Sequence, residues 1–151
     1  PISFGPLITT GMYLVLTGSV EPRVVAASLP IGFLIANVLW INQYPDYEAD
    51  KKAGKYNWVV RMGKEKGIRV FVLMFALAYA AFLLLALLYR NPVWLLGLIS
   101  VPVAVRSVRT AKREFGCTAK LIPANIGTVQ VYQITGLVMV IAALSNRFVS
   151  S

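Results

Sequence analysis

The chain has 151 residues, of which 58% are apolar and only 14% are charged, and its formal net charge is +9. A soluble globular domain has about 45–50% apolar and about 25% charged residues. Here the excess apolar residues form blocks of roughly the 20 residues that cross a bilayer. This pattern excludes disordered, collagen-like and disulfide-rich secreted chains and a nucleic-acid partner, and it predicts an all-α, polytopic transmembrane helical bundle.

Two residue types that often carry chemistry are almost absent. The chain contains no histidine and a single cysteine, Cys117. Histidine-dependent catalytic pairs, His-ligated zinc and His-ligated haem are therefore excluded, and no internal disulfide can form. Any chemistry must use carboxylates, amines, guanidinium groups, amides and phenols.

Five apolar blocks predict about five spans within a single membrane domain, residues 1–151. The blocks are Phe4–Leu16, Val24–Ile41, Val70–Leu88, Val93–Val105 and Ile122–Leu144. The first is short for a full span, and the fourth contains Pro102 and could cross only by tilting or by thinning the bilayer. Because the chain begins at Pro1 without a methionine, we expect part of the protein upstream of the first block to be missing.

The distribution of basic residues predicts the orientation of these spans. Twelve of the 15 Lys and Arg residues fall after the second and fourth blocks, and the other three are Arg23, Arg90 and Arg147. Basic residues favour the cytoplasmic face of a membrane. We therefore expect the segments 42–69 and 106–120 to be cytoplasmic loops and the C-terminus to lie outside.

The polar segment 42–69 carries the candidate site. Asp46 and Asp50 lie four residues apart, which places them on one face of a helix, where like charges repel. This spacing costs stability unless a cation lies between the two carboxylates. Asn42 lies one turn earlier on that face, although Pro45 interrupts a regular helix. The pattern predicts an oxygen-only metal site of Asn42, Asp46 and Asp50.

Oxygen ligands without sulfur or imidazole favour Mg²⁺, with Mn²⁺ as a possible substitute. Mg²⁺ commonly binds one or two carboxylates together with substrate phosphates, so a diphosphate is the natural partner of this site. Basic residues that could contact its remaining oxygens follow the aspartates: Lys51, Lys52, Lys55 and Arg61. On residue types alone, a solvated loop whose aspartates offset its lysines explains the segment equally well.

The run from Asn42 to Gly63, N-Q-Y-P-D-Y-E-A-D-K-K-A-G-K-Y-N-W-V-V-R-M-G, resembles the second aspartate-rich motif of the UbiA-type membrane prenyltransferases. The opening run F-G-P-L-I-T-T-G-M-Y is similar to the start of the second half in the 1,4-dihydroxy-2-naphthoate polyprenyltransferase branch. The resemblance implies the C-terminal half of a bundle of about nine spans. In that family each half supplies one aspartate motif to a shared cavity.

The resemblance also implies an activity, namely the Mg²⁺-assisted transfer of a polyprenyl group from its diphosphate to an aromatic or quinone-precursor acceptor. Asp46 and Asp50 would be the catalytic carboxylates, and they would bind the metal together with Asn42. One departure from the family is Tyr56-Asn57-Trp58, where R-T-L is usual. Another is that only one aspartate motif is present, so we expect the chain to be inactive without an N-terminal half that carries the first motif.

Two other functions fit the membrane composition. A non-catalytic membrane scaffold or binding protein could keep the fold without turnover. A CDP-alcohol phosphatidyltransferase is also a membrane enzyme that uses aspartates and Mg²⁺, but its D-G-x-x-A-R signature is missing from this chain.

Polar and aromatic residues within the predicted spans have two interpretations each. For the last span we favour hydrogen bonds between helices over cavity lining; its polar residues are Asn125, Thr128, Gln130, Gln133 and Thr135. Aromatic residues recur every three or four positions in the third span, at Phe71, Phe75, Tyr79 and Phe82. For these we favour a packing or lipid-facing stripe over a prenyl tunnel. Asn37, in the middle of the second span, is a weaker candidate for the active cavity.

Overall fold

The computed structural model describes residues 1–149, and every regular element in them is a helix. Four helical segments are long and apolar enough to cross a membrane: α2 (Pro22–Ile41), α5 (Lys64–Leu88), the continuous segment Pro92–Glu114, and most of α7 (Thr118–Val149). The prediction of an all-α, polytopic bundle is confirmed. Of the five predicted spans, the structure gives four at full length.

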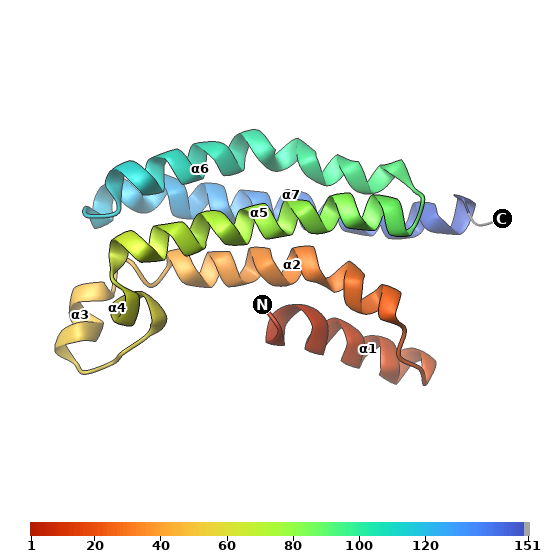
Figure 1. Cartoon of the computed structure of the whole chain (residues 1–151), viewed down its shortest axis with the longest axis horizontal. Helices are drawn as coiled ribbons and strands as arrows, with labels where there is room; N and C mark the ends of the chain where they lie inside the picture. Colours follow the sequence, from red (N-terminus) through yellow and green to blue (C-terminus); the bar gives the residue numbers. More distant parts are fainter. Residues whose placement is uncertain (150–151) are drawn as a thin grey trace.

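The N-terminal helical segment is shorter than the other four. It consists of a π-helical turn, η1 (Ser3–Leu7), followed by α1 (Ile8–Thr17), and it ends at Gly18 with a φ of 71°. Its first turn packs closely on α2, where a Cβ atom on Gly5 would lie 2.8 Å from the Gly32 Cα. The N-terminus lies beside the middle of α2, so this segment covers only part of that helix (Figure 1).

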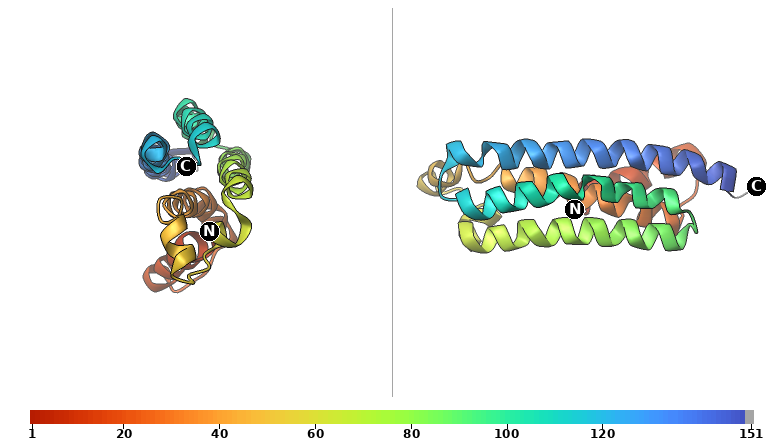
Figure 2. Two further views of the ribbon diagram at one scale, coloured as in Figure 1. Left: turned by 90° about the vertical axis from the view of Figure 1, so that its left-hand side faces the viewer. Right: turned by 90° about the horizontal axis from the view of Figure 1, so that it is seen from above.

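The four long helices form a bundle in which each neighbour runs back alongside the one before it (Figure 1). Helix α2 packs along α5, helix α6 (Val101–Glu114) packs along α7, and α7 returns to contact α2. In the end-on view, the α2–α7 seam and the α5–α6 seam lie on opposite sides of the bundle (Figure 2). This arrangement brings the second and last spans together, although about 80 residues separate their contacting ends.

The segment Pro92–Glu114 corrects one prediction. A 3-10 helix, η2 (Pro92–Ser100), continues into α6 (Val101–Glu114), so the span does not stop at Val105. The predicted basic loop, 106–120, is helical at both ends, and only Phe115–Cys117 form the turn. No helix breaker separates Val105 from Glu114, and basic side chains can extend from a helix into the polar interface. Charge density therefore did not mark the end of the helix.

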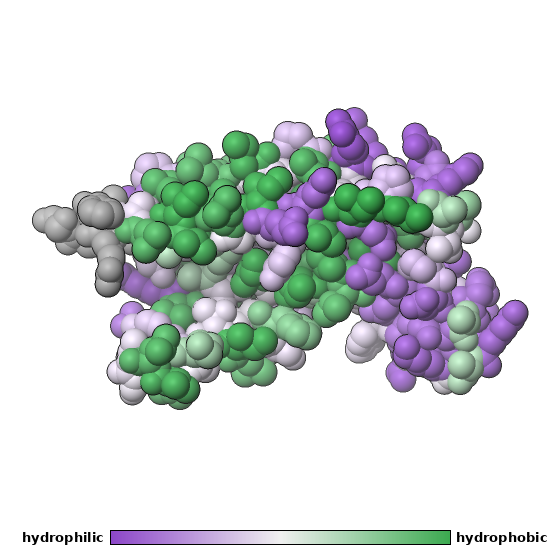
Figure 3. Space-filling view, turned by 180° about the vertical axis from the view of Figure 1, so that it is seen from behind, coloured by the Kyte–Doolittle hydropathy of each residue, from purple (hydrophilic) through white to green (hydrophobic). Residues whose placement is uncertain are grey.

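Both strongly basic stretches lie at the same end of the bundle, as the alternation of spans predicts. The α6–α7 turn lies at the same end of the bundle as the segment that connects α2 to α5 (Figure 1). Hydrophilic residues gather at this end, whereas apolar residues cover much of the sides (Figure 3). The bundle thus has a polar cap at one end and a surface suited to lipid along its length.

The aromatic stripe of α5 is part of the core. Phe71, Phe75 and Phe82 are buried, and the rings of Phe71 and Phe75 meet edge to face at 5.1 Å. The Tyr79 hydroxyl forms a hydrogen bond with the Ser100 hydroxyl at 2.9 Å. These contacts support the packing interpretation of the stripe rather than a prenyl tunnel.

Candidate functional site

We use the name cap for residues 42–63, which connect α2 to α5 at the polar end of the bundle. The cap contains two short helices, whereas a simple loop was predicted for residues 42–69. Helix α3 covers Tyr47–Lys52 and helix α4 covers Trp58–Met62, and α5 then begins at Lys64. Between α2 and α3 the residues 42–46 form turns, because Pro45 disfavours a helical conformation at the residue before it. Gly54 and Gly63 allow the sharp turns after α3 and α4, with φ values of 70° and 82°.

Two side chains tie the end of α2 to the start of α5 and thereby position the cap. The Trp40 indole nitrogen donates to the Gly67 carbonyl at 2.9 Å, and the Tyr44 hydroxyl donates to the Lys64 carbonyl at 2.8 Å. Burial raises the pKa of the Tyr44 hydroxyl above its ordinary value, so this group stays a protonated donor. The turn that leads to the aspartates is therefore anchored on a rigid part of the bundle.

The two aspartates lie one helical turn apart, but their surroundings differ. The Asp50 backbone nitrogen donates to the Asp46 carbonyl at 2.8 Å. The Asp46 side chain is exposed and has no hydrogen bond or ion pair with the side chains that the structure describes. The Asp50 side chain is 13% exposed, with one oxygen 3.2 Å from Lys55 Nζ and the other accepting from Asn57 Nδ2 at 2.7 Å. Asp46 is thus the open carboxylate, and Asp50 is held in place by the chain.

Asn57, one of the three residues that depart from the family motif, connects Asp50 to α4. Its side-chain oxygen accepts from the Val60 backbone nitrogen at 2.9 Å and caps the helix, while its nitrogen donates to Asp50. No role was predicted for Asn57 from the sequence. Its position just before a short helix is a typical capping signal, but nothing in the sequence indicates that its side-chain nitrogen donates to Asp50.

Asn42, the third predicted metal ligand, meets a residue from the far end of the chain. The Asn125 side-chain nitrogen on α7 donates to the Asn42 side-chain oxygen at 2.9 Å. The interhelical hydrogen bond expected for Asn125 is therefore found, and it brings this residue into the candidate site. The other side-chain oxygen of the pair, Asn125 Oδ1, is buried and has no hydrogen-bond partner within the described residues.

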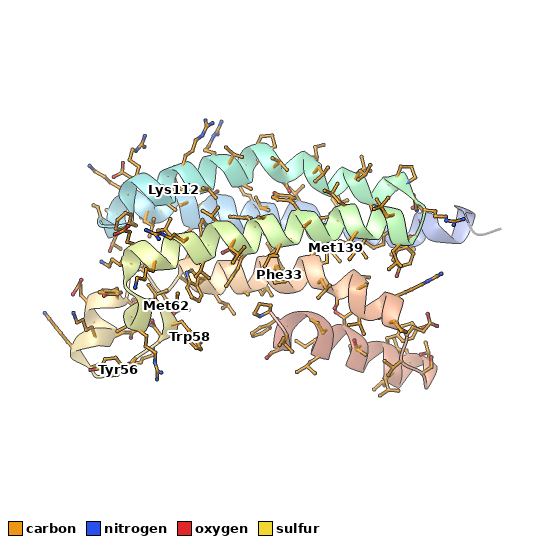
Figure 4. The ribbon with its side chains drawn as sticks, viewed as in Figure 1. Phe33, Tyr56, Trp58, Met62, Lys112 and Met139 are labelled. Atoms are coloured by element: carbon orange, nitrogen blue, oxygen red, sulfur yellow. The ribbon has the colours of Figure 1, made fainter. Side chains whose placement is uncertain are left out.

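The predicted diphosphate contacts are spread around the cap. Lys51 and Lys52 are exposed on the last turn of α3, and Lys55 is engaged with Asp50. The Arg61 Nε atom donates to the Tyr56 carbonyl at 2.9 Å and borders a hollow of about 290 Å³ that Gln43 and Trp58 also line. Figure 4 shows Tyr56 and Trp58 on this side of the cap. Of these four predicted contacts, only Lys51 and Lys52 have side chains with no hydrogen bond or ion pair among the described residues.

The donor set of the cap fits Mg²⁺ better than a transition metal. Residues 1–149 contain no cluster of three or more His, Cys, Asp or Glu side chains, so the chain offers two carboxylates and one amide. Mg²⁺ accepts one or two carboxylates and takes its remaining ligands from water and phosphate. The open Asp46 carboxylate and the exposed Asn42 amide suit such a shared site, whereas Asp50 must exchange Lys55 or Asn57 for a metal ion.

The other intramembrane polar residues do not converge on the cap. Asn37 is buried and donates to the Phe71 carbonyl at 3.1 Å, so it joins α2 to α5. Thr128 and Thr135 are buried and bond to carbonyls of their own helix, and Gln130 and Gln133 are exposed on α7. The prediction of hydrogen bonds between helices is therefore wrong for Thr128 and Thr135. Asn37, in contrast, joins two helices, which favours a structural role over a place in the active cavity.

The fold and this cap together define an integral membrane protein whose carboxylate- and lysine-rich end lies at the membrane interface. Residues 1–121 match the model of the UbiA prenyltransferase family. This match covers well over half of the chain, and the chain belongs to that family.

Curated relatives come from plants and bacteria. The chain is 27% identical over 154 residues to the Arabidopsis thaliana chloroplastic 2-carboxy-1,4-naphthoquinone phytyltransferase, covering 96% of the chain and 40% of that protein. Against the 1,4-dihydroxy-2-naphthoate octaprenyltransferase of Haemophilus influenzae it is 38% identical over 54% of the chain and 27% of the relative. The Bacillus subtilis protein of the same name is 24% identical over 97% of the chain and 47% of the relative. The chain thus spans less than half the length of these relatives, and no solved structure matches it.

Proposed function

We propose that this chain supplies the diphosphate-binding part of an intramembrane prenyltransferase, which moves a polyprenyl group from its diphosphate to an aromatic quinone precursor. The observation that carries this proposal is the cap itself, where an open Asp46, a held Asp50 and unpaired lysines meet at the end of an apolar bundle. Family membership supports the reaction class. The names of the relatives support a naphthoate-type or naphthoquinone-type acceptor.

The residues of the cap would divide the work on the diphosphate. Mg²⁺, or Mn²⁺ in its place, would neutralise diphosphate charge when held by Asn42, Asp46 and Asp50. Lys51 and Lys52 would bind the phosphate oxygens that face the polar end. Lys55 and Arg61 could also bind phosphate oxygens after they release Asp50 and the Tyr56 carbonyl. Charge stabilisation of the leaving diphosphate would let the allylic carbon–oxygen bond ionise, with its electron pair leaving on the diphosphate. The acceptor ring would then capture the prenyl cation and release the group on the attacked carbon, as a proton or as carbon dioxide from a carboxylate.

The exposed amides of α7 support the proposal that another segment completes the site. Gln130 and Gln133 are exposed within a stretch that is apolar enough to cross a membrane. Polar groups in hydrocarbon are costly unless they face protein or water. We therefore propose that a segment carrying a second aspartate motif covers this face, on the same polypeptide or on another, and that the 151-residue chain by itself does not turn over.

Complementation tests this function. The chain is reconstituted in vesicles alone, and together with the part of the Bacillus subtilis relative that it does not cover. Both samples receive a polyprenyl diphosphate and 1,4-dihydroxy-2-naphthoate. We expect prenylated product only from the pair, its loss on chelation of divalent ions, and its return with added Mg²⁺. Product from the chain alone, or turnover insensitive to chelation, would contradict the proposal, and failure of the pair would favour the scaffold alternative. UbiA membership gives the phosphatidyltransferase alternative no support.

The single cysteine tests the proposed cytoplasmic side of the cap. Cys117 is exposed in the turn between α6 and α7, at the same end of the bundle as the aspartates. In cells, a membrane-impermeant maleimide added outside should leave Cys117 unlabelled, and it should react only after the membrane is opened. A Cys117→Ser/Ser19→Cys variant, with its thiol at the opposite end, should show the reverse. Labelling of Cys117 from outside would show that the cap lies on the outer side of the membrane, opposite to the proposed orientation.

Asn125 offers a test of the Asn42 ligand. Asn125→Ala removes the donor that orients the Asn42 amide, and loss of such an orienting partner typically weakens metal binding by about 10–100-fold. We expect the Mg²⁺ concentration for half-maximal turnover of the complemented enzyme to rise accordingly. Ile122→Ala, an exposed change one turn earlier on α7, is the control. An unchanged Mg²⁺ requirement in Asn125→Ala would remove Asn42 from the metal site.

A further inference from the structure

A groove with a basic rim lies between α5 and α6, on the side of the bundle opposite the α2–α7 seam (Figure 2). Helix α5 packs closely on η2 but only sparsely on α6, so the two helices diverge toward the polar cap. The resulting groove has a volume of about 360 Å³. Its lining includes Val72, Ala76, Tyr79, Val105, Arg109 and Lys112.

The polarity of the groove changes along the bundle axis. Arg109 and Lys112 belong to the last two turns of α6, at the end that carries the cap, and Lys112 is visible there in Figure 4. Val72, Ala76 and Val105 line the groove farther from that end, and Tyr79 turns its hydroxyl to Ser100. The groove is therefore cationic at the membrane interface and apolar toward the bilayer centre.

The cations at its rim lack partners within the protein. Arg113 is paired with Glu114 at 2.7 Å, and Glu114 is the single acidic residue between positions 101 and 145. Arg109 and Lys112 form no ion pair with any described side chain, nor does the neighbouring Arg106. Arg106 and Arg109 also border a second hollow of about 560 Å³ on the adjoining face of α6. An anion from outside the chain would compensate this charge.

We propose that the α5–α6 groove binds one anionic phospholipid, whose phosphate contacts Arg109 and Lys112 and whose acyl chain lies against Val72, Ala76 and Val105. Free phosphate would contact the basic rim, Arg109 and Lys112, but not the apolar floor, Val72, Ala76 and Val105. A neutral lipid would contact the floor but would not be attracted by the charges of the rim. The groove is separate from the aspartates, because Asn42 meets Asn125 at the opposite seam. The proposal therefore does not depend on the prenyltransferase activity.

Lipid retention tests this site. The full chain is purified in a neutral detergent and mixed with phosphatidylglycerol or phosphatidylcholine of the same acyl chains, and bound lipid is counted by native mass spectrometry. Arg109→Gln/Lys112→Gln removes the rim, and Ala76→Trp fills the floor without changing charge. Lys66→Gln/Lys120→Gln is the matched control, since both lysines are exposed at the same end but outside the groove. Circular dichroism checks that each variant keeps its helices.

We expect the chain to retain phosphatidylglycerol in preference to phosphatidylcholine, and the rim variant to bind it about 30-fold more weakly, since each interfacial cation contributes roughly a fivefold gain. Ala76→Trp should also lose the lipid, and the Lys66/Lys120 control should retain it. Equal losses in the rim variant and its control would show a general charge effect and overturn the proposal. So would full competition by inorganic phosphate, which needs no floor, or displacement by an isoprenoid diphosphate, which would make the groove a substrate site.

Discussion

Asp46→Asn should lower turnover of the complemented enzyme by roughly 100-fold or more, a loss typical of removing one group that stabilises developing charge. The substitution keeps the size of the side chain and removes its charge. Because the Asp46 carboxylate has no partner within the described residues, the fold loses no contact, and thermal unfolding of the chain should not change. The measurements are initial rates at saturating Mg²⁺ and a melting curve for each variant.

Asp50→Asn tests the second proposed carboxylate ligand, and Glu48→Gln tests whether any loss of negative charge on α3 has the same effect. Asp50→Asn should lower turnover to a similar extent, but with some loss of stability, because it weakens the contact with Lys55 and disturbs the hydrogen bond from Asn57. Glu48→Gln is the matched control, since Glu48 is exposed on the same helix between the two aspartates and faces Lys64 only at 3.6 Å. If Glu48→Gln were as inactive as Asp46→Asn, the loss would reflect the charge of α3 rather than a metal site.

Gly67→Val should destabilise the chain by about 1–3 kcal/mol, the usual cost of overpacking a filled site. A Cβ atom at Gly67 would collide with the Tyr44 hydroxyl, which donates to Lys64, and the Gly67 carbonyl accepts from Trp40. The substitution therefore strains the junction between α2 and α5 from which the aspartate segment begins. We expect a lower melting temperature in detergent and reduced turnover after complementation.

The same substitution at Gly11 controls for the effect of a branched residue in a helix. Gly11 lies in α1, and no other group lies within 4 Å of the position its Cβ would take. Gly11→Val should melt close to the unmodified chain. A melting temperature for Gly67→Val equal to that of Gly11→Val would mean that Tyr44 can leave its position without cost, and that it does not anchor the cap.

Hydrophobic block length predicted most of the fold, because a bilayer of fixed thickness demands helices of nearly fixed length. The predicted spans 24–41 and 70–88 correspond to α2 and to most of α5, and the charge asymmetry correctly predicted that both basic stretches share one end. The prediction was wrong at 93–105, where the helix continues to Glu114. Long basic side chains reach the interface from a helix, so polarity marks membrane depth there and not the end of a helix.

The sequence alone determined the helical membrane class, the number of long spans to within one, and the aspartates with their oxygen-only chemistry, because all of these depend on composition and local spacing. Only the tertiary structure decided that Asn125 meets Asn42, that Asn57 and Lys55 hold Asp50 while Asp46 stays open, and that the cations of α6 overhang an apolar groove. Each of these contacts depends on how helices distant in sequence, or the two short helices of the cap, turn toward one another. Side-chain packing determines how the helices are oriented, and the hydropathy of the sequence does not predict it.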